Sequence, residues 1–240
     1  DNLLVVKGLV ENRTKAAALA MAGKVYSGER KLDKPGQKFA DDTSLNVREA
    51  LHPWVSRGGM KLAHALQHFN LDPTDRIAID VGASTGGFTD VLLSKGARRV
   101  YAVDVGYGQL ADKVRRDDRV IILERTNARQ IGLSKIPELV DAVVCDASFI
   151  GLRTVLPAAL ALAAPGAFLA ALIKPQFEVG RERVGKGGIV RDPEVHSEIC
   201  KMISAWLSVQ PGWKFLGITE SPITGAEGNV EFFLAGIFSG

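Results

Sequence analysis

The stretch that most restricts the fold of this chain is residues 77–93, IAIDVGASTGGFTDVLL. Its apolar start predicts a buried strand, and the apolar spacing from Phe88 onward predicts a helix. A strand, a glycine-rich turn and a helix N-terminus in this order form a ligand-binding cradle in α/β proteins. Ser84 stands where the dinucleotide fingerprint has its second glycine, and no Gly-Lys-Ser/Thr follows the turn. The turn therefore favours a ligand other than a diphosphate.

From residue 77 onward, predicted strands alternate with predicted helices, the pattern of a doubly wound, mostly parallel sheet. The expected strands are 77–81, 99–104, 119–123, 140–146, 167–174, 213–220 and 230–238. The expected helices begin near Met60, Gly86, Gln109, Leu152 and Pro193. Asp192-Pro193 is a favourable pair of cap and first helical residue. The connection between the last two strands is too short for a crossover helix, so we expect that pair to be antiparallel.

Basic residues are concentrated near the start of the chain, at residues 13–38, where seven Lys and Arg accompany two acidic residues. Residues 12–23 predict a short helix capped by Asn12. Residues 24–39 predict short strands with a turn at Ser27-Gly28. A solvated basic surface and a nucleic-acid-binding face are both compatible with this charge.

The composition gives expectations about location and metal binding. The chain is 46% hydrophobic and 24% charged, with a net charge of +3, as in a soluble globular protein. No apolar run reaches the ~18 residues of a membrane helix. Cys145 and Cys200 form neither a disulfide framework nor a zinc set, which fits a reducing, cytoplasmic setting. His64 and His68 have the spacing of a helical metal pair but no suitable third ligand, so we expect no metal. No feature defines the oligomeric state.

Polar residues follow four predicted strands at the edge where such sheets bind ligands. Asp80, Asp104 and Asp146 end three of these strands, and Asn127 follows a fourth. Asp104 is placed to hold ribose hydroxyls and Asn127 to accept a hydrogen bond from the exocyclic amine of a base. Asp80 and Asp104 could equally be helix caps. Together with a turn that rejects pyrophosphate, the set favours S-adenosylmethionine.

Three further residues have the charge that such a site needs for chemistry. Lys174 follows an apolar strand, Glu231 lies inside the apolar final strand, and Lys61 begins the helix before the first strand. Each alone has an ordinary structural explanation, but a buried charge requires a partner. With Asp146 they form a Lys-Asp-Lys-Glu set in the order 61, 146, 174 and 231.

This set resembles the tetrad of the heat-shock-type RNA 2′-O-methyltransferases. Eight ordered blocks, SRGG-KL, DVGASTGGFTD, YAVDVGYGQL, ERTNAR, CDASFI, IKPQFE, GKGGIVRD and GNVEFF, resemble the hemolysin-A-type family of ribosomal RNA cytidine 2′-O-methyltransferases. This resemblance covers essentially all 240 residues. Residues 3–48 look like the RNA-binding domain first seen in ribosomal small-subunit protein four, with Ser27-Gly28 where members usually carry Asn-Gly.

The resemblance implies methyl transfer from S-adenosylmethionine to a cytidine 2′-hydroxyl of ribosomal RNA, with ribosomal subunits as partners. Lys174 would activate the hydroxyl, since desolvation lowers the pKa of a lysine. Asp146 would orient Lys174, and Lys61 and Glu231 would complete the alternating charges. Which lysine carries the proton stays open, because coupled groups titrate together. Alignment of the two reactants alone can supply ~7–11 kcal/mol.

The expected organisation is an RNA-binding domain at 1–48, a linker at 49–59 and a methyltransferase domain at 60–240. The chain begins without methionine, so we expect the first domain to be truncated at its N-terminus. The long loop 175–193 is interpreted as a mobile clamp on RNA phosphates or as a merely flexible loop. Ser56–Gly59 would close over the carboxylate end of the cofactor, although Arg57 could be an ordinary linker charge.

Two sets of residues are expected to bind ligands. The cofactor set is Ser56, Arg57, Gly58, Gly59, Asp80, Gly82, Ala83, Ser84, Gly86, Phe88, Asp104, Val105, Asn127, Ala128 and Asp146. The RNA set is Arg13, Lys15, Lys24, Arg30, Lys31, Arg181, Arg183 and Lys186.

Two other classes of protein fit part of the sequence. A hemolytic, pore-forming or membrane-active protein should show a membrane span or a long amphipathic segment, and neither is visible. A catalytically silent RNA-binding protein could keep this fold, although the intact tetrad argues against it. Cofactor binding, and loss of methyl transfer with retained RNA binding in Lys174→Ala, would separate these classes from the enzyme.

Overall fold

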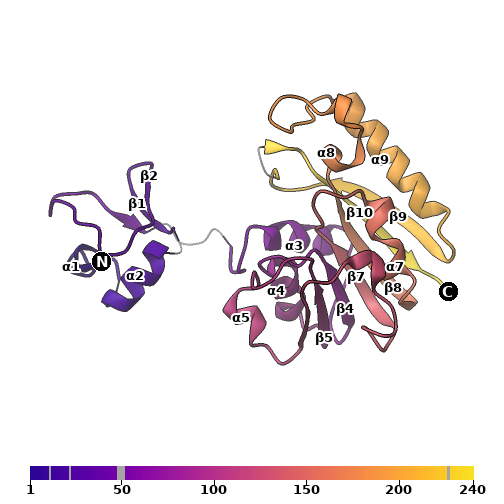
Figure 1. The fold of residues 1–240 in the computed structure, drawn as a ribbon, viewed down its shortest axis with the longest axis horizontal. Coiled ribbons are helices and arrows are strands. Elements are labelled where there is room, and N and C mark those ends of the chain that lie inside the picture. Colours follow the sequence, from indigo (N-terminus) through magenta and orange to yellow (C-terminus); the bar gives the residue numbers. More distant parts are fainter. Residues whose placement is uncertain (11, 22, 48–51, 226–227) are drawn as a thin grey trace. The chain divides into compact units, whose positions relative to one another are not determined.

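The computed structural model of the chain describes all residues except 11, 22, 48–51 and 226–227, and also leaves the Arg181 side chain undescribed. The chain forms two compact units, Asp1–Pro53 and Trp54–Gly240 (Figure 1). Residues 54–59, which the sequence interpretation assigned to the linker, belong to the larger unit. The reason is packing: a Cβ at Gly59 would lie 2.6 Å from Trp54 Cβ, so these residues are in close contact. Of the rest of the expected linker, residues 49–51 lie outside the described residues.

The smaller unit is a pair of helices on a three-stranded sheet of order β2-β1-β3. Its elements are α1 Asn2–Val6, α2 Arg13–Met21, β1 Val25–Ser27, β2 Arg30–Leu32 and β3 Asn46–Val47. The predicted cap is confirmed, since Asn12 Oδ1 accepts a hydrogen bond from Lys15 N at 2.8 Å. The hairpin loop is Gly28-Glu29, one residue later than predicted, because Ser27 pairs with Arg30. Gly28 has φ +58°, a conformation that glycine adopts readily.

The larger unit contains a seven-stranded sheet of order β6-β5-β4-β7-β8-β10-β9. The strands are β4 Ile77–Val81, β5 Arg99–Val103, β6 Val120–Leu123, β7 Val140–Cys145, β8 Ala163–Ile173, β9 Trp213–Glu220 and β10 Phe232–Phe238. Strands β4 to β8 pair in parallel, and β10 is antiparallel to both β8 and β9. The doubly wound sheet and the antiparallel last pair predicted from the sequence are therefore confirmed.

The helices of the larger unit follow the predicted order with three differences, one of which is a short helix at Pro175–Glu178 inside the expected loop 175–193. They are α3 Gly58–His68, α4 Gly87–Ser94, α5 Asp112–Arg115, α6 Leu152–Val155, α7 Pro157–Leu160, α8 Pro175–Glu178 and α9 Pro193–Ser208, with short 3₁₀ turns η1 Ala128–Gln130 and η2 Arg181–Arg183. The helix expected near Gln109 begins only at Asp112. The one expected at Leu152 is split in two because Pro157 has no N–H to continue it. The cap at Asp192 is confirmed: its Oδ1 accepts from Glu194 N at 2.9 Å.

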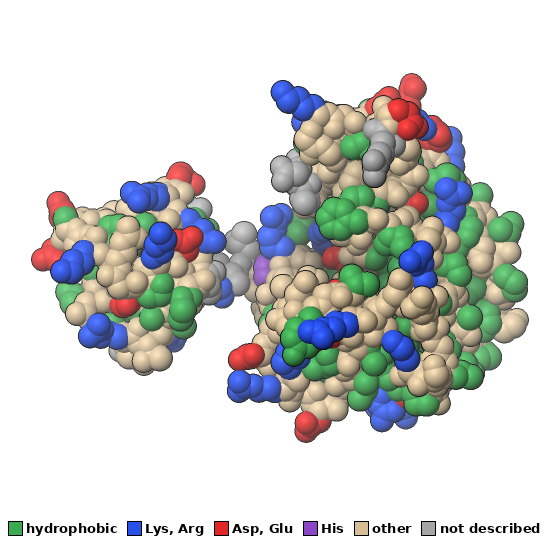
Figure 2. Space-filling view, in the orientation of Figure 1, with side chains coloured by type: hydrophobic (Ala, Val, Ile, Leu, Met, Phe, Trp, Pro, Cys, Tyr) green, Lys and Arg blue, Asp and Glu red, His purple; other side chains and the backbone are tan. Residues whose placement is uncertain are grey.

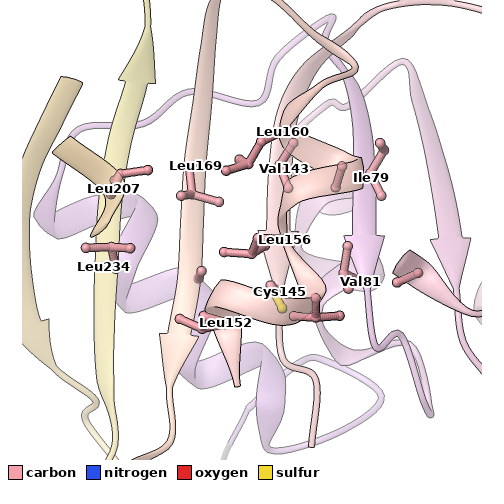
Figure 3. Close-up of a cluster of buried hydrophobic side chains, with 14 of the residues drawn as sticks. Ile79, Val81, Val143, Cys145, Leu152, Leu156, Leu160, Leu169, Leu207 and Leu234 are labelled. Atoms are coloured by element: carbon pink, nitrogen blue, oxygen red, sulfur yellow. The ribbon is translucent and has the colours of Figure 1, made fainter. Parts of the chain in front are cut away.

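Both faces of the sheet are covered by helices, which explains why its central strands are almost continuously apolar. One face packs against α6, α7 and α9, in a cluster that includes Val143, Leu156, Leu169 and Leu207 (Figure 3). The other face packs against α3, α4 and α5. The carboxyl ends of the parallel strands consequently meet at one edge, which is left free for a ligand.

We expect Leu169→Ala to lower the free energy of unfolding of the larger unit by about 2–5 kcal/mol, because Leu169 has no exposed surface. Leu133→Ala is the matched control: Leu133 is 62% exposed, and its loss should stay within about 0.5 kcal/mol. Urea unfolding followed by tryptophan fluorescence measures both, since all three tryptophans lie beyond residue 53. Equal midpoints for the two variants would contradict this description of the core.

Candidate active site

Two buried ion pairs stand at the edge where the parallel strands end. Lys174, directly after β8, places Nζ 2.7 Å from Asp146 Oδ1, directly after β7. Lys61, in the first turn of α3, places Nζ 2.5 Å from Glu231 Oε2, directly before β10. Lys61, Lys174 and Glu231 are 8%, 7% and 2% exposed, and all three are charged side chains that require partners at such burial. The structure thus assembles all four residues of the expected tetrad.

Strand order and register explain why these four charges meet. Strands β7 and β8 are parallel neighbours, so Asp146 and Lys174 leave the sheet at the same edge. Strand β10 pairs with β8 in a register that sets Phe232 opposite Ile173, so Glu231 and Lys174 are adjacent just beyond that pair. One cavity of about 310 Å³ is lined by Lys61, Asp146 and Lys174.

The segment before β10 closes over Glu231 and is tied to the loop 175–193. A Cβ at Gly225 would lie 2.0 Å from Glu231 Oε1, so a side chain there would push this carboxylate out of its present position. Asn229 is 2% exposed; its Oδ1 accepts from Val190 N at 3.1 Å, and its Nδ2 donates to Gly188 O at 3.0 Å. Sequence reasoning missed both residues, although GNVEFF was among the recognised blocks.

The glycine-rich turn after β4 contains a glycine where no other residue would fit. Gly82 has φ +81°, and a Cβ there would lie 2.8 Å from Ala147 Cα, so a side chain would collide with the backbone after β7. Ser84 N donates to Asp104 Oδ2 at 2.8 Å, and Gly106 N donates to Asp104 Oδ1 at 2.7 Å. Asp104 therefore joins the turn to the end of β5, in a part of the edge that stays open to a ligand.

Asp80 lies beneath the turn and has no exposed surface. Its Oδ2 accepts a hydrogen bond from Thr89 Oγ1 at 2.6 Å. Burial raises the pKa of Asp80 to about 7, and the negative charges of Asp146 and Asp104 act in the same direction. A wholly buried side chain does not face a ligand. Asp80 is therefore not positioned for the direct cofactor contact that the sequence predicted.

A second cavity of about 490 Å³ adjoins the first and shares Gly82, Ser84, Asp146 and Ser148 with it. It is also lined by four of the other expected cofactor residues, Asp104, Val105, Asn127 and Ala128. The first cavity is lined by Ser56, Arg57, Gly58, Ala83 and Phe88. Gly59 and Gly86 line neither cavity, since Gly59 packs on Trp54 and Gly86 on Leu110 and Val114.

Asn127 has a different hydrogen-bonding partner from the one expected. Its Oδ1 accepts from Arg129 N at 3.1 Å and from Arg129 Nε at 3.3 Å, so this oxygen caps the turn η1. The expected role of Oδ1 as acceptor for a base amine would require it to share or exchange these bonds.

The residues expected to bind RNA lie in both units. In the smaller unit Arg13, Lys15, Arg30 and Lys31 are exposed and Lys24 is half-buried. Lys and Arg side chains are spread over the visible face of this unit, with acidic side chains between them (Figure 2).

The residues expected to bind RNA in the loop after β8 differ from one another in their contacts. Lys186 is exposed there. Arg183 instead makes two hydrogen bonds to Glu198 of α9, at 2.9 and 2.6 Å. The side chain of Arg181 lies outside the described residues. Arg183 and Asn229 connect this loop to α9 and to the segment before β10, and its role as a mobile clamp stays a prediction.

Two features of the described residues bear on the alternatives. Within them, no group of three or more His, Cys, Asp or Glu side chains is arranged to hold a metal ion. No helix in the described part of the chain combines the length and the apolar character needed to cross a membrane.

The fold and the site together define an α/β methyltransferase: a mostly parallel sheet in this strand order, a glycine-rich turn that is not a phosphate loop, and an acidic residue at the end of the second strand. The chain belongs to the FtsJ-like methyltransferase family, which matches residues 54–238. The resemblance of the larger unit to the heat-shock-type methyltransferases is confirmed, and the resemblance of residues 3–48 to a ribosomal-protein RNA-binding domain stays a prediction.

Three known proteins are similar over nearly the whole chain. YqxC of Bacillus subtilis, whose name assigns it provisionally to the rRNA methyltransferases, is 50% identical over 98% of this chain and 83% of its own. TlyA of Mycobacterium tuberculosis, named a 16S/23S rRNA (cytidine-2′-O)-methyltransferase, is 47% identical over 98% and 87%. A solved structure from Streptococcus thermophilus that carries a hemolysin name is 43% identical, with a TM-score of 0.77 over 99% and 86%.

We expect the stability difference between the wild type and Asp80→Asn to depend on pH. Between its ordinary pKa of 3.8 and the raised value of about 7, the folded chain keeps the Asp80 proton while the unfolded chain releases it. The stabilisation from Asp80 is therefore complete below about pH 4 and is lost as the pH rises through 7. Each pKa unit is worth about 1.4 kcal/mol, so the loss is on the order of a few kcal/mol.

Urea unfolding at several pH values from about 5 to 8 measures this difference. The wild type should lose stability relative to Asp80→Asn as the pH rises to about 7 and then level off. A difference that stays constant over the whole range would show that Asp80 is ionised in the folded chain.

Proposed function

We propose that this protein methylates ribosomal RNA, transferring the methyl group of S-adenosylmethionine to the 2′-hydroxyl of a cytidine ribose. The observation that carries the proposal is the two ion pairs beside the glycine-rich turn, of which Lys61, Asp146 and Lys174 line one cavity. A ribose hydroxyl is a weak nucleophile and needs a positioned group to remove its proton. The names of the two curated relatives, which describe rRNA methyltransferases, support the same reaction.

The residues at the turn fit S-adenosylmethionine, which when bound supplies an electrophilic methyl group on a sulfonium centre. Asp104 is an acceptor for ribose hydroxyls, and the cavity around Ala128 has room for a base. The absence of a side chain at Gly82 lets a ligand approach the backbone closely. Arg57, which lines the first cavity, would pair with the carboxylate of the cofactor.

The tetrad would act on the substrate hydroxyl. Lys174 is the candidate proton acceptor, and Asp146 fixes the direction of its side chain through the 2.7 Å contact. The pair Lys61 and Glu231 completes the ring of alternating charges and keeps this part of the cavity polar. Holding the hydroxyl in line with the methyl group would itself lower the barrier by ~7–11 kcal/mol.

The smaller unit would bring the enzyme to its substrate. Its exposed Arg13, Lys15, Arg30 and Lys31 would contact RNA phosphates, in keeping with the resemblance to the ribosomal-protein RNA-binding domain. Ribosomal subunits are the proposed partner, and the cytoplasm is the proposed location. Two free cysteines are compatible with that location.

We expect Lys174→Ala to slow methyl transfer at least ~10²-fold in a single turnover, because removal of a general base typically costs that much. Lys201→Ala changes an exposed lysine on α9 and serves as the control with wild-type rate. The assay uses labelled S-adenosylmethionine with each ribosomal subunit, and with intact ribosomes, from cells lacking this activity. Nuclease digestion and mass spectrometry then identify the labelled nucleoside, which should be 2′-O-methylcytidine.

Two results would contradict the proposal. The first is label on a base instead of a ribose in the wild-type reaction. The second is a Lys174→Ala variant that transfers methyl groups at the wild-type rate.

A further inference from the structure

The Lys174 amine lies against three protein oxygen atoms. Three oxygens lie within 3.0 Å of Nζ: Asp146 Oδ1 at 2.7 Å, the backbone oxygen of Asp146 at 3.0 Å and Ser148 Oγ at 2.8 Å. A lysine ammonium has three N–H groups, and the side chain of Lys174 is only 9% exposed. The backbone oxygen of Asp146 and Ser148 Oγ accept its hydrogen bonds, and Asp146 Oδ1 forms the ion pair, so a substrate hydroxyl meets Ser148 Oγ beside a largely buried amine.

Of the three oxygens, only Ser148 Oγ can act either as an acceptor or as a donor of a hydrogen bond. A backbone carbonyl and a carboxylate can only accept hydrogen bonds, whereas a hydroxyl can accept from an ammonium and donate to a neutral amine. Neutral Lys174 has a lone pair, and Ser148 is the contact that can donate a hydrogen to it. The two Asp146 oxygens would instead repel that lone pair.

Ser148 is also the member of this group that a substrate can reach. It is exposed and lines both cavities, the one around the tetrad and the one beside Asp104. Its position is fixed from one side, because the backbone of Ala147 packs directly against Gly82. Ser148 Oγ thus joins the open space of both cavities to the Lys174 amine.

We propose that Ser148 is a catalytic residue that relays the proton of the substrate hydroxyl to Lys174; this rests on the proposed function. The substrate 2′-hydroxyl donates its hydrogen bond to Ser148 Oγ, while the Ser148 O–H donates to the neutral Lys174 amine. In the transfer the 2′ O–H bond breaks as a new O–H bond forms at Ser148. The original Ser148 O–H bond breaks as an N–H bond forms at Lys174.

The electrons and charges of this step balance. The electron pair of the 2′-oxygen forms the new O–CH₃ bond, and the pair of the S–CH₃ bond stays on sulfur. A sulfonium and a neutral amine become a thioether and an ammonium, so the total charge is unchanged. The ammonium is then stabilised by Asp146, in the arrangement that the structure shows.

The test compares Ser148→Ala, which removes the hydroxyl, with Ser148→Thr, which keeps it. Single-turnover methyl transfer to ribosomal subunits should fall at least ~10²-fold in Ser148→Ala and stay within about tenfold of wild type in Ser148→Thr. Ser134→Ala, at an exposed serine outside both cavities, is the control. The affinity for S-adenosylmethionine, measured by calorimetry, should be unchanged in all three variants.

A second readout separates a relay from a mere positioning role. The rate is measured in mixtures of H₂O and D₂O: two protons moving in one transition state give a curved dependence on deuterium fraction, and one proton gives a straight line. We expect a curve for the wild type and for Ser148→Thr.

Two outcomes would overturn the relay alone: a Ser148→Ala rate within about threefold of wild type, or a straight line for a wild-type enzyme that methylates ribose. A wild-type enzyme that methylates no ribose would overturn the proposed function, and the relay with it. The labelled nucleoside in the wild-type reaction therefore separates failure of the proposed function from failure of the relay.

Discussion

The arrangement of this site depends on the cost of burying charge. An ionised side chain removed from water loses several kcal/mol unless a partner and hydrogen bonds replace the water. Lys174 and Asp146 satisfy this requirement across the ends of two neighbouring parallel strands, and Lys61 and Glu231 satisfy it between a helix and the antiparallel strand. Loss of one charge would leave its partner buried and unpaired, so the sheet order and register that join them are tightly constrained.

Glycines make this concentration of charge sterically feasible. Gly82 lets the turn after β4 touch the backbone of Ala147, which carries the chain from Asp146 to Ser148. Gly225 leaves room for the Glu231 carboxylate. Asp80 supports the same turn from below: it accepts a hydrogen bond from Thr89, and its raised pKa favours the neutral form below about pH 7. The resulting edge is polar and closely packed, and the two adjoining cavities open along it.

The sequence predicted those features that depend on neighbouring residues. Apolar periodicity located the strands of the sheet, and Asp192-Pro193 located the start of α9. Lys174 and Glu231 were conspicuous because each interrupts an apolar run, and the resemblance to a known family connected them with Lys61 and Asp146.

Features that depend on contacts between distant segments were missed or misplaced. Ser148 became a candidate only when Lys174, 26 positions away, was seen to donate to it. Asn229 contacts Val190 across 39 positions, so no local pattern reveals its part in holding the loop. Residues 54–59 look like a linker by composition, but Trp54 packs on Gly59. Asp80 ends a strand as a ligand-binding acid would, and only the fold shows that the turn covers it.

The central claim is that one site holds the methyl donor beside the Lys174–Asp146 pair. A crystal structure of the chain with S-adenosylhomocysteine tests it most directly. The account predicts the ribose of the ligand at Asp104 and its sulfur on the side of Gly82 that faces Lys174. A ligand bound elsewhere, or with its sulfur directed away from Lys174, would contradict the account.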